Sequence, residues 1–196
     1  MGKVIYLTGA PATGKSTLCN QLLNEHSNIE YISYSGELLD YIKNKPHQTG
    51  LDHKTLREKS SSVITKDDVD SVDKIIEEKC RHTRLTKNLI IDSHPITKED
   101  YGFRVTGFNV DILREISPDI IICLYADPTI ILNRIISDSD GRLIPSLFDV
   151  NIHIQSQINL SMTYGIITDS PVYLIDSDQS LSELVSIVAN RCKINT

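Results

Sequence analysis

Residues 9–16 read Gly9-Ala10-Pro11-Ala12-Thr13-Gly14-Lys15-Ser16, and this stretch decides how the rest of the chain is interpreted. It fits the pattern G-x-x-x-x-G-K-[ST], between an apolar run at 4–7 and an amphipathic segment that starts at Thr17. Glycines let the backbone curl so that its N–H groups point inward, and the following helix adds its positive N-terminal end. We therefore expect residues 9–17 to hold the phosphates of a nucleotide, with Lys15 reaching the outer phosphates and Ser16 offering its hydroxyl to Mg²⁺.

Length and composition are typical of one globular domain. The chain has 196 residues, 40% hydrophobic and 23% charged, and a formal net charge of -6. Because a broad nucleic-acid footprint needs clustered Lys and Arg, this charge argues against nucleic-acid binding. The longest apolar run, residues 120–126, is too short to span a bilayer, and no membrane anchor is expected. Four widely spaced cysteines in apolar patterns predict buried thiols and a cytoplasmic location.

Strand patterns alternate with helix patterns along the chain. Apolar runs predict strands near residues 3–8, 31–33, 89–92, 120–125 and 172–175, and helical spacing of apolar residues predicts helices between them. Ser35 is a candidate cap for the second helix, and residues 93–109 are predicted to form a long functional loop. This alternation predicts an α/β fold with a mainly parallel sheet covered by helices on both faces.

An acidic residue ends the buried strand at 89–92. A carboxylate at that position, Asp92, would hold a Mg²⁺ water beside the Ser16 hydroxyl, although an Asp after a strand also forms ordinary turns. His94 follows two residues later, at the sheet edge where ligands of open α/β sheets bind. We expect it either to contact the nucleotide or the acceptor, or to be structural.

Three arginines are candidates for stabilising negative charge during phosphoryl transfer. Arg134 lies on the helix after the strand at 120–125, and Arg142 lies in a glycine-containing loop that could close as a lid. Arg57 lies in a polar region where it could clamp an acceptor's anionic group. Each of the three could instead be a solvated surface residue.

The chain resembles the archaeal-type adenylate kinases, a branch of the P-loop nucleoside monophosphate kinases, over nearly its whole length. The resemblance rests on residues 7–16, the strand end Ile90-Ile91-Asp92-Ser93-His94, and Gly102-Phe103 leading to Gly107. It continues through residues 117–122, the Ala126-Asp127-Pro128 turn before Arg134, and residues 164–168.

The resemblance implies a five-stranded parallel sheet, an acceptor-binding region at about residues 34–84 and a short lid at about 138–147. It also implies reversible phosphoryl transfer from Mg-ATP to AMP. By that likeness Gly14, Lys15, Ser16 and Thr17 hold the ATP phosphates, Arg57 contacts the acceptor phosphate, and Arg134 and Arg142 are lid-side cations.

The chain departs from the family's pattern at several cationic positions. Two consecutive arginines are usual where this chain has Arg134-Ile135, and Arg142 is followed by Leu143-Ile144-Pro145. The family's Gln and Asn-Arg fall at Ile154 and Gln157-Ile158. Three hypotheses remain: a nucleoside monophosphate kinase with AMP as acceptor, a nucleotide-dependent ATPase or binding module that controls a protein partner, or a P-loop kinase for another small acceptor.

Overall fold

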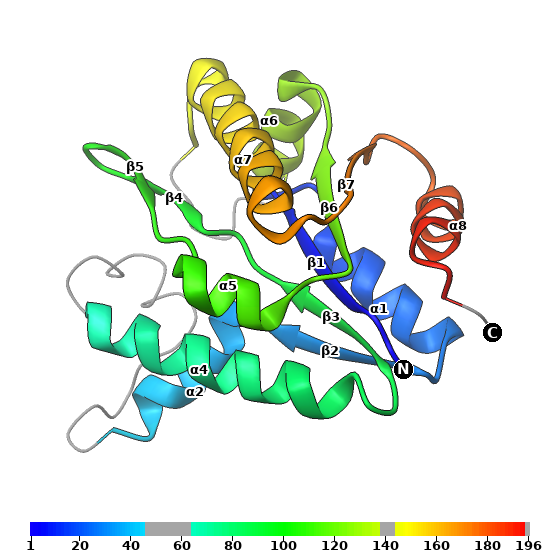
Figure 1. Ribbon diagram of the computed structural model, residues 1–196. Helices are drawn as coiled ribbons and strands as arrows, with labels where there is room; N and C mark the ends of the chain where they lie inside the picture. Colours follow the sequence, from blue (N-terminus) through cyan, green and yellow to red (C-terminus); the bar gives the residue numbers. More distant parts are fainter. Residues whose placement is uncertain (46–63, 138–143, 195–196) are drawn as a thin grey trace.

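A five-stranded parallel sheet forms the centre of the protein, which confirms the predicted α/β class. The computed structural model describes residues 1–45, 64–137 and 144–194 (Figure 1). The strand order is β2-β3-β1-β6-β7, so β1 lies between β3 and β6. The strands are β1 (Val4–Gly9), β2 (Ile29–Ser33), β3 (Asn88–Asp92), β6 (Ile120–Tyr125) and β7 (Val172–Asp176).

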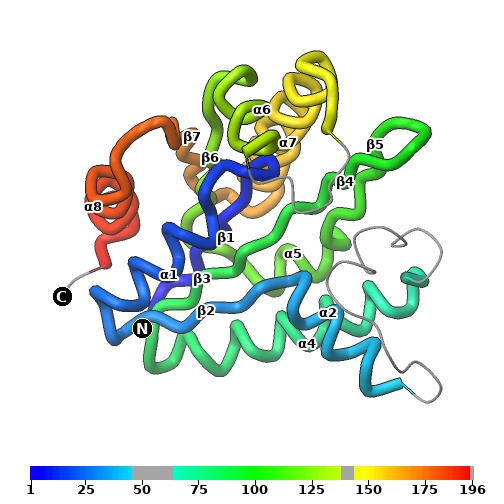
Figure 2. Tube along the Cα trace, turned by 180° about the vertical axis from the view of Figure 1, so that it is seen from behind, coloured from blue at the N-terminus to red at the C-terminus, as the bar shows by residue number. Residues whose placement is uncertain are grey.

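Helices cover both faces of this sheet. They are α1 (Lys15–Glu25), α2 (Tyr34–Lys43), α4 (Lys66–Thr83), α5 (Val110–Ile116), α6 (Pro128–Ser137), α7 (Leu147–Thr168) and α8 (Leu181–Cys192). Helices α1 and α8 lie together on one face, and α4, α5 and α7 lie on the other (Figures 1 and 2). Helix α2 follows β2 at the sheet edge and packs against α4.

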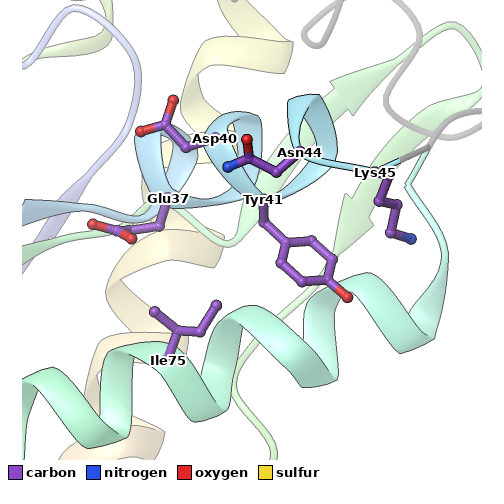
Figure 3. Close-up of a pocket in the computed structure, with 6 residues that line it drawn as sticks. All are labelled: Glu37, Asp40, Tyr41, Asn44, Lys45 and Ile75. Carbon is purple, nitrogen blue, oxygen red and sulfur yellow. The ribbon is translucent and has the colours of Figure 1, made fainter. Parts of the chain in front are cut away.

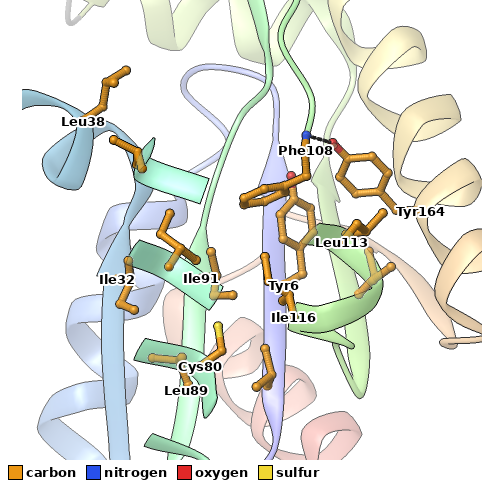
Figure 4. Packing of buried hydrophobic residues seen from close by; sticks show 14 of the residues in the cluster. Tyr6, Ile32, Leu38, Cys80, Leu89, Ile91, Phe108, Leu113, Ile116 and Tyr164 are labelled. Atoms are coloured by element: carbon orange, nitrogen blue, oxygen red, sulfur yellow. Dashed lines mark hydrogen bonds between the residues drawn. The ribbon is translucent and has the colours of Figure 1, made fainter. Parts of the chain in front are cut away.

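The alternation of side chains along β1 divides the core into two layers, because successive side chains of a strand point to opposite faces. Val4 and Tyr6 pack with residues of α4, α5 and α7, whereas Ile5 and Leu7 pack with residues of α1 and α8. The first of these layers includes a cluster of aromatic side chains. Within it, the Tyr164 hydroxyl accepts a 2.8 Å hydrogen bond from the Phe108 backbone N–H (Figure 4).

The prediction that residues 93–109 form only a long loop is wrong over its centre. An antiparallel hairpin forms there from β4 (Ile96–Glu99) and β5 (Gly102–Val105). Its four-residue strands are too short and too polar to produce a clear alternating pattern. The hairpin is tied to α7 instead: the ring of Phe103 meets that of His153 edge-on, and His153 Nε2 lies 3.0 Å from the Ile96 carbonyl oxygen.

A smaller difference concerns the second βα unit, whereas the thiols are as predicted. Strand β2 begins at Ile29, and α2 is capped by Ser33, not by Ser35, because the Ser33 hydroxyl accepts the Gly36 N–H. All four cysteines are free and buried, as their apolar patterns predict. Within the described residues, the helices are too short or too polar to cross a membrane.

Candidate functional site: the phosphate loop and its surroundings

The predicted phosphate loop lies between β1 and α1 at the carboxyl edge of the sheet. Three of its residues have positive φ angles: Gly9 at 150°, Ala12 at 61° and Gly14 at 83°. A Cβ atom at Gly9 would lie 2.5 Å from the Leu124 carbonyl oxygen, so this position requires glycine. The Thr13 hydroxyl donates a 2.8 Å hydrogen bond to the Ala10 carbonyl and holds the curl of the loop.

The first turn of α1 is suited to an anion. Gly14 stands at its N-cap and supplies no side-chain acceptor, whereas α4, α7 and α8 each begin with a capping box. The first turn of α1 also carries no acidic residue. Its backbone N–H groups and the positive end of the helix dipole can therefore serve a bound phosphate.

The Lys15 side chain folds back over the loop that precedes it. Its Nζ donates to the Gly9 carbonyl at 2.7 Å and to the Ala10 carbonyl at 3.3 Å. Burial lowers the pKa of this ammonium, and the nearby Asp92 carboxylate acts in the opposite direction. The cation therefore lies directly against the loop that is predicted to hold the phosphates.

Asp92 lies at the end of β3 beside this loop. The β1–β3 register places it next to Leu7, and its side chain is buried. Its Oδ2 accepts a 3.0 Å hydrogen bond from the Tyr31 hydroxyl, while its buried Oδ1 has no hydrogen-bond partner among the described residues. Burial raises the pKa of this carboxyl, an effect that Lys15 and the Tyr31 hydroxyl partly offset.

Arg134 connects the phosphate loop to the segment between β7 and α8. Its guanidinium donates to the Ala12 carbonyl at 3.5 Å and to the Ser177 carbonyl at 3.1 Å. It also contacts the Asp178 carboxylate at 3.3 Å. The side chain thus lies at the rim of the loop on the β7 side, opposite Asp92 across the sheet order.

The remaining predicted residues are placed as follows. Ser16 and Thr17 are exposed in the first turn of α1, and His94 is exposed just beyond Asp92. Arg57 and Arg142 lie outside the described residues. The structure therefore brings together the loop, Asp92 and Arg134.

Two residues that support the site were not predicted to do so. Gln157 on α7 donates a 2.6 Å hydrogen bond from Nε2 to Thr8 Oγ1, one residue before the loop. Tyr31 on β2 holds Asp92. Gln157 was indicated only by its place at a position where the resembled family has Asn, and no sequence pattern indicated Tyr31.

A separate pocket of about 420 Å³ lies between α2 and α4, within the predicted acceptor-binding region (Figure 3). It is lined by Glu37, Asp40, Tyr41, Asn44, Lys45 and Ile75. None of these belongs to the phosphate loop, and two of them are acidic, so the pocket does not suit the phosphates of the donor nucleotide.

The sequence and position of the phosphate loop define a class of protein. A loop of this sequence between the central strand and the first helix of a parallel sheet is characteristic of P-loop nucleotide-binding proteins. The family profile described as "AAA domain" matches residues 8–145, and the chain belongs to that family.

Curated relatives cover nearly the full chain. The chain is 26% identical over 189 residues to the adenylate kinase of Methanopyrus kandleri, spanning 94% of this chain and 95% of that protein. It is 27% identical over 193 residues to the adenylate kinase of Methanothermobacter thermautotrophicus, spanning 95% and 99%. With the loop described above, these likenesses support a phosphotransferase.

Solved structures show the same fold at low sequence identity. A tunicamycin resistance protein of Deinococcus radiodurans has a TM-score of 0.63 and 12% identity, with 100% of this chain and 98% of that chain covered. A deoxyadenosine kinase of M. mycoides has a TM-score of 0.58 and 13% identity, with 97% and 98% covered.

Proposed function

We propose that this protein transfers the γ-phosphoryl group of ATP to a nucleoside monophosphate, with AMP as the acceptor. The observation that carries the proposal is the meeting of the phosphate loop and Lys15 with the buried carboxylate of Asp92, contributed by adjacent strands. The full-length likeness to archaeal adenylate kinases supports it.

The donor phosphates are assigned to residues 9–17. Their backbone N–H groups and the α1 N-terminus would hold the phosphate chain, and the Lys15 ammonium would move from its own loop carbonyls to the outer phosphates. Arg134 would secure the donor side by bridging the loop and Ser177. In the reaction, a phosphate oxygen of the acceptor bonds to the γ-phosphorus as the bond to the ADP oxygen breaks.

The residues present fit a magnesium ion. Mg²⁺ prefers oxygen ligands and commonly binds through one or two carboxylates together with substrate phosphates. The exposed Ser16 hydroxyl and the unpartnered Asp92 Oδ1 are the groups that would hold it. When bound, the ion would neutralise charge that develops on the phosphate oxygens.

The acceptor side is assigned to the region at about 34–84 and the lid to about 138–147. Arg57 would contact the acceptor phosphate, Arg142 would close over the transferred group, and His94, just beyond Asp92, would contact the acceptor. Helices α2 and α4 would form the described part of the acceptor region, because they pack against each other.

The test is a panel of nucleoside monophosphates offered with Mg-ATP, with ADP formation as the readout. We expect formation that depends on AMP. Lys15→Ala should abolish it by removing the cation over the loop. Lys87→Ala, a half-exposed lysine that pairs with Glu30 outside the loop and the acceptor region, is the matched control and should leave it intact. If no monophosphate is phosphorylated, the kinase proposal is wrong.

A second candidate, an ATPase that controls a protein partner, is favoured by one observation. Ile135 and Ile158 lie at positions where the archaeal-type adenylate kinases have arginines. Ile135 belongs to an apolar cluster that includes residues of α6 and α7, and Ile158 packs against it. Because an arginine in this role is worth about 10³ or more in rate, their absence favours slow transfer. An ATP hydrolysis rate that no monophosphate changes would favour this candidate over the kinase.

A further inference from the structure

One hydrogen bond outside the phosphate loop determines how the candidate metal-binding carboxylate is presented. The Tyr31 hydroxyl donates to Asp92 Oδ2 at 3.0 Å. Among the described residues no donor reaches Oδ1, although that atom is buried. The two oxygens of Asp92 are therefore different: one is occupied by the protein and the other is left for a ligand.

The position of Tyr31 on β2 explains why its hydroxyl reaches Asp92. The parallel register pairs Tyr31 with Ile90, and Asp92 lies two residues further along β3 on the same face. A tyrosine side chain is long enough to reach this diagonal neighbour. Its ring is half-buried and packs against the apolar cluster beneath α1 and α8, so the direction of the hydroxyl is fixed by packing.

Lys15 does not perform this task. Its ammonium is hydrogen-bonded to the Gly9 and Ala10 carbonyls, so it acts on Asp92 through space without a direct hydrogen bond. Because a buried carboxylate with one oxygen unheld could rotate about its terminal torsion, the tyrosine hydroxyl is the contact that fixes the orientation of the group.

We propose that Tyr31 is a positioning residue that turns Asp92 Oδ1 toward the nucleotide-bound Mg²⁺. This inference rests on the metal assignment within the proposed function, and it adds the residue that orients the metal-binding carboxylate. Groups that orient a metal-binding side chain commonly change metal affinity by about 10- to 100-fold when they are removed. We expect removal of the Tyr31 hydroxyl to reduce the contribution of Mg²⁺ to ATP binding by a factor of the same size.

The experiment compares Tyr31→Phe with the parent protein by calorimetric titration of the β,γ-imido analogue of ATP, with Mg²⁺ and with EDTA. Tyr31→Phe keeps the ring and removes only the hydroxyl. We expect analogue binding in EDTA to be unchanged, and the increase in affinity caused by Mg²⁺ to fall by about tenfold or more. Tyr173→Phe on β7, a half-buried ring that packs against the same cluster, is the matched control and should leave both affinities unchanged.

Two results with the single variants would overturn the proposal, and a third comes from a double variant. One is an unchanged Mg²⁺ enhancement in Tyr31→Phe; the other is an equal loss in Tyr31→Phe and Tyr173→Phe, which would indicate a general packing effect. Asp92→Asn should also reduce the enhancement, and adding Tyr31→Phe to it should cause no further loss. Independent, multiplying losses in the double variant would show that Tyr31 does not act through Asp92.

The outcome is separable from that of the kinase proposal, because these titrations contain no acceptor. A protein that phosphorylates AMP but whose Mg²⁺ enhancement ignores Tyr31 would refute the positioning role alone. A protein whose enhancement depends on Tyr31 but that phosphorylates no monophosphate would refute the kinase alone.

Discussion

Replacing Asp73 by asparagine is expected to stabilise the protein near neutral pH, and this advantage is expected to disappear as the pH falls below the ordinary pKa of an Asp carboxyl. Asp73 lies on α4 and is 1% exposed, and its Oδ1 accepts a 2.7 Å hydrogen bond from the Tyr34 hydroxyl on α2. Burial raises the pKa of this carboxyl to about 6, although the Tyr34 hydroxyl and the backbone of Asn109 act in the opposite direction. Asp70 adds a smaller repulsion that also raises it.

The size of the effect follows from the difference between the folded and unfolded states. The folded-state pKa lies above the ordinary value of 3.8, so the favourable contribution of this group is fully present below that value. It is lost as the pH rises through about 6. The shift from 3.8 to about 6 corresponds to about 3 kcal/mol of unfolding free energy. Asparagine is neutral at every pH and avoids this loss, although its side chain places N–H donors where Asp73 has a carboxylate oxygen.

The assay is urea unfolding of the parent and Asp73→Asn at a series of pH values. We expect the variant's advantage in unfolding free energy to grow by about 2 kcal/mol between about pH 4.5 and about pH 8, with m-values unchanged. Asp40→Asn, at an exposed position on α2, is the matched control and should show no such trend. A difference between variant and parent that does not change with pH, or a variant that is less stable at pH 8, would refute the reasoning.

Three further substitutions test other parts of the structure. Arg134→Ala should weaken ATP binding by about tenfold, because it releases the loop from Ser177, whereas Arg114→Ala on the surface of α5 should not; titration with ATP decides. Gly107→Ala should lower the unfolding free energy by about 1–3 kcal/mol, since its Cβ would lie 2.5 Å from the buried Tyr164 hydroxyl, and an unchanged urea midpoint would contradict this. Leu22→Ala should cost about 2–5 kcal/mol because Leu22 is fully buried, whereas Leu181→Ala, at a partly exposed site, should cost much less by the same assay.

The first βα unit could be predicted because its signals are local. The apolar run of β1, the glycines of the loop and the helical spacing of Leu18 and Leu22 are all read within 25 residues of sequence. The hairpin at 96–105 could not be predicted, because its strands show no alternating pattern of their own. They are held instead by contacts of Ile96 and Phe103 with His153 on α7.

The sequence motifs indicated the candidate site residues, but not the residues that hold them in place. Asp92 was indicated by its place after a buried strand, yet its contact with Tyr31 depends on the register of β2 against β3, which no local pattern specifies. Gln157 likewise reaches Thr8 only because α7 crosses the sheet beside β1. The roles of Arg57 and Arg142 stay predictions, because both lie outside the described residues.

The pairing of β1 with β3 has a consequence for how the protein folds. Leu7 and Asp92 are neighbours in the sheet but far apart in the chain, with α1, β2, α2 and α4 between them. A nucleotide held by both the loop and Asp92 would therefore bind only to molecules in which β1 and β3 have already paired, so that the chain between them forms a closed loop. Such a ligand would raise the free energy of unfolding of the central strands, and amide hydrogens of β1 and β3 should exchange more slowly in its presence.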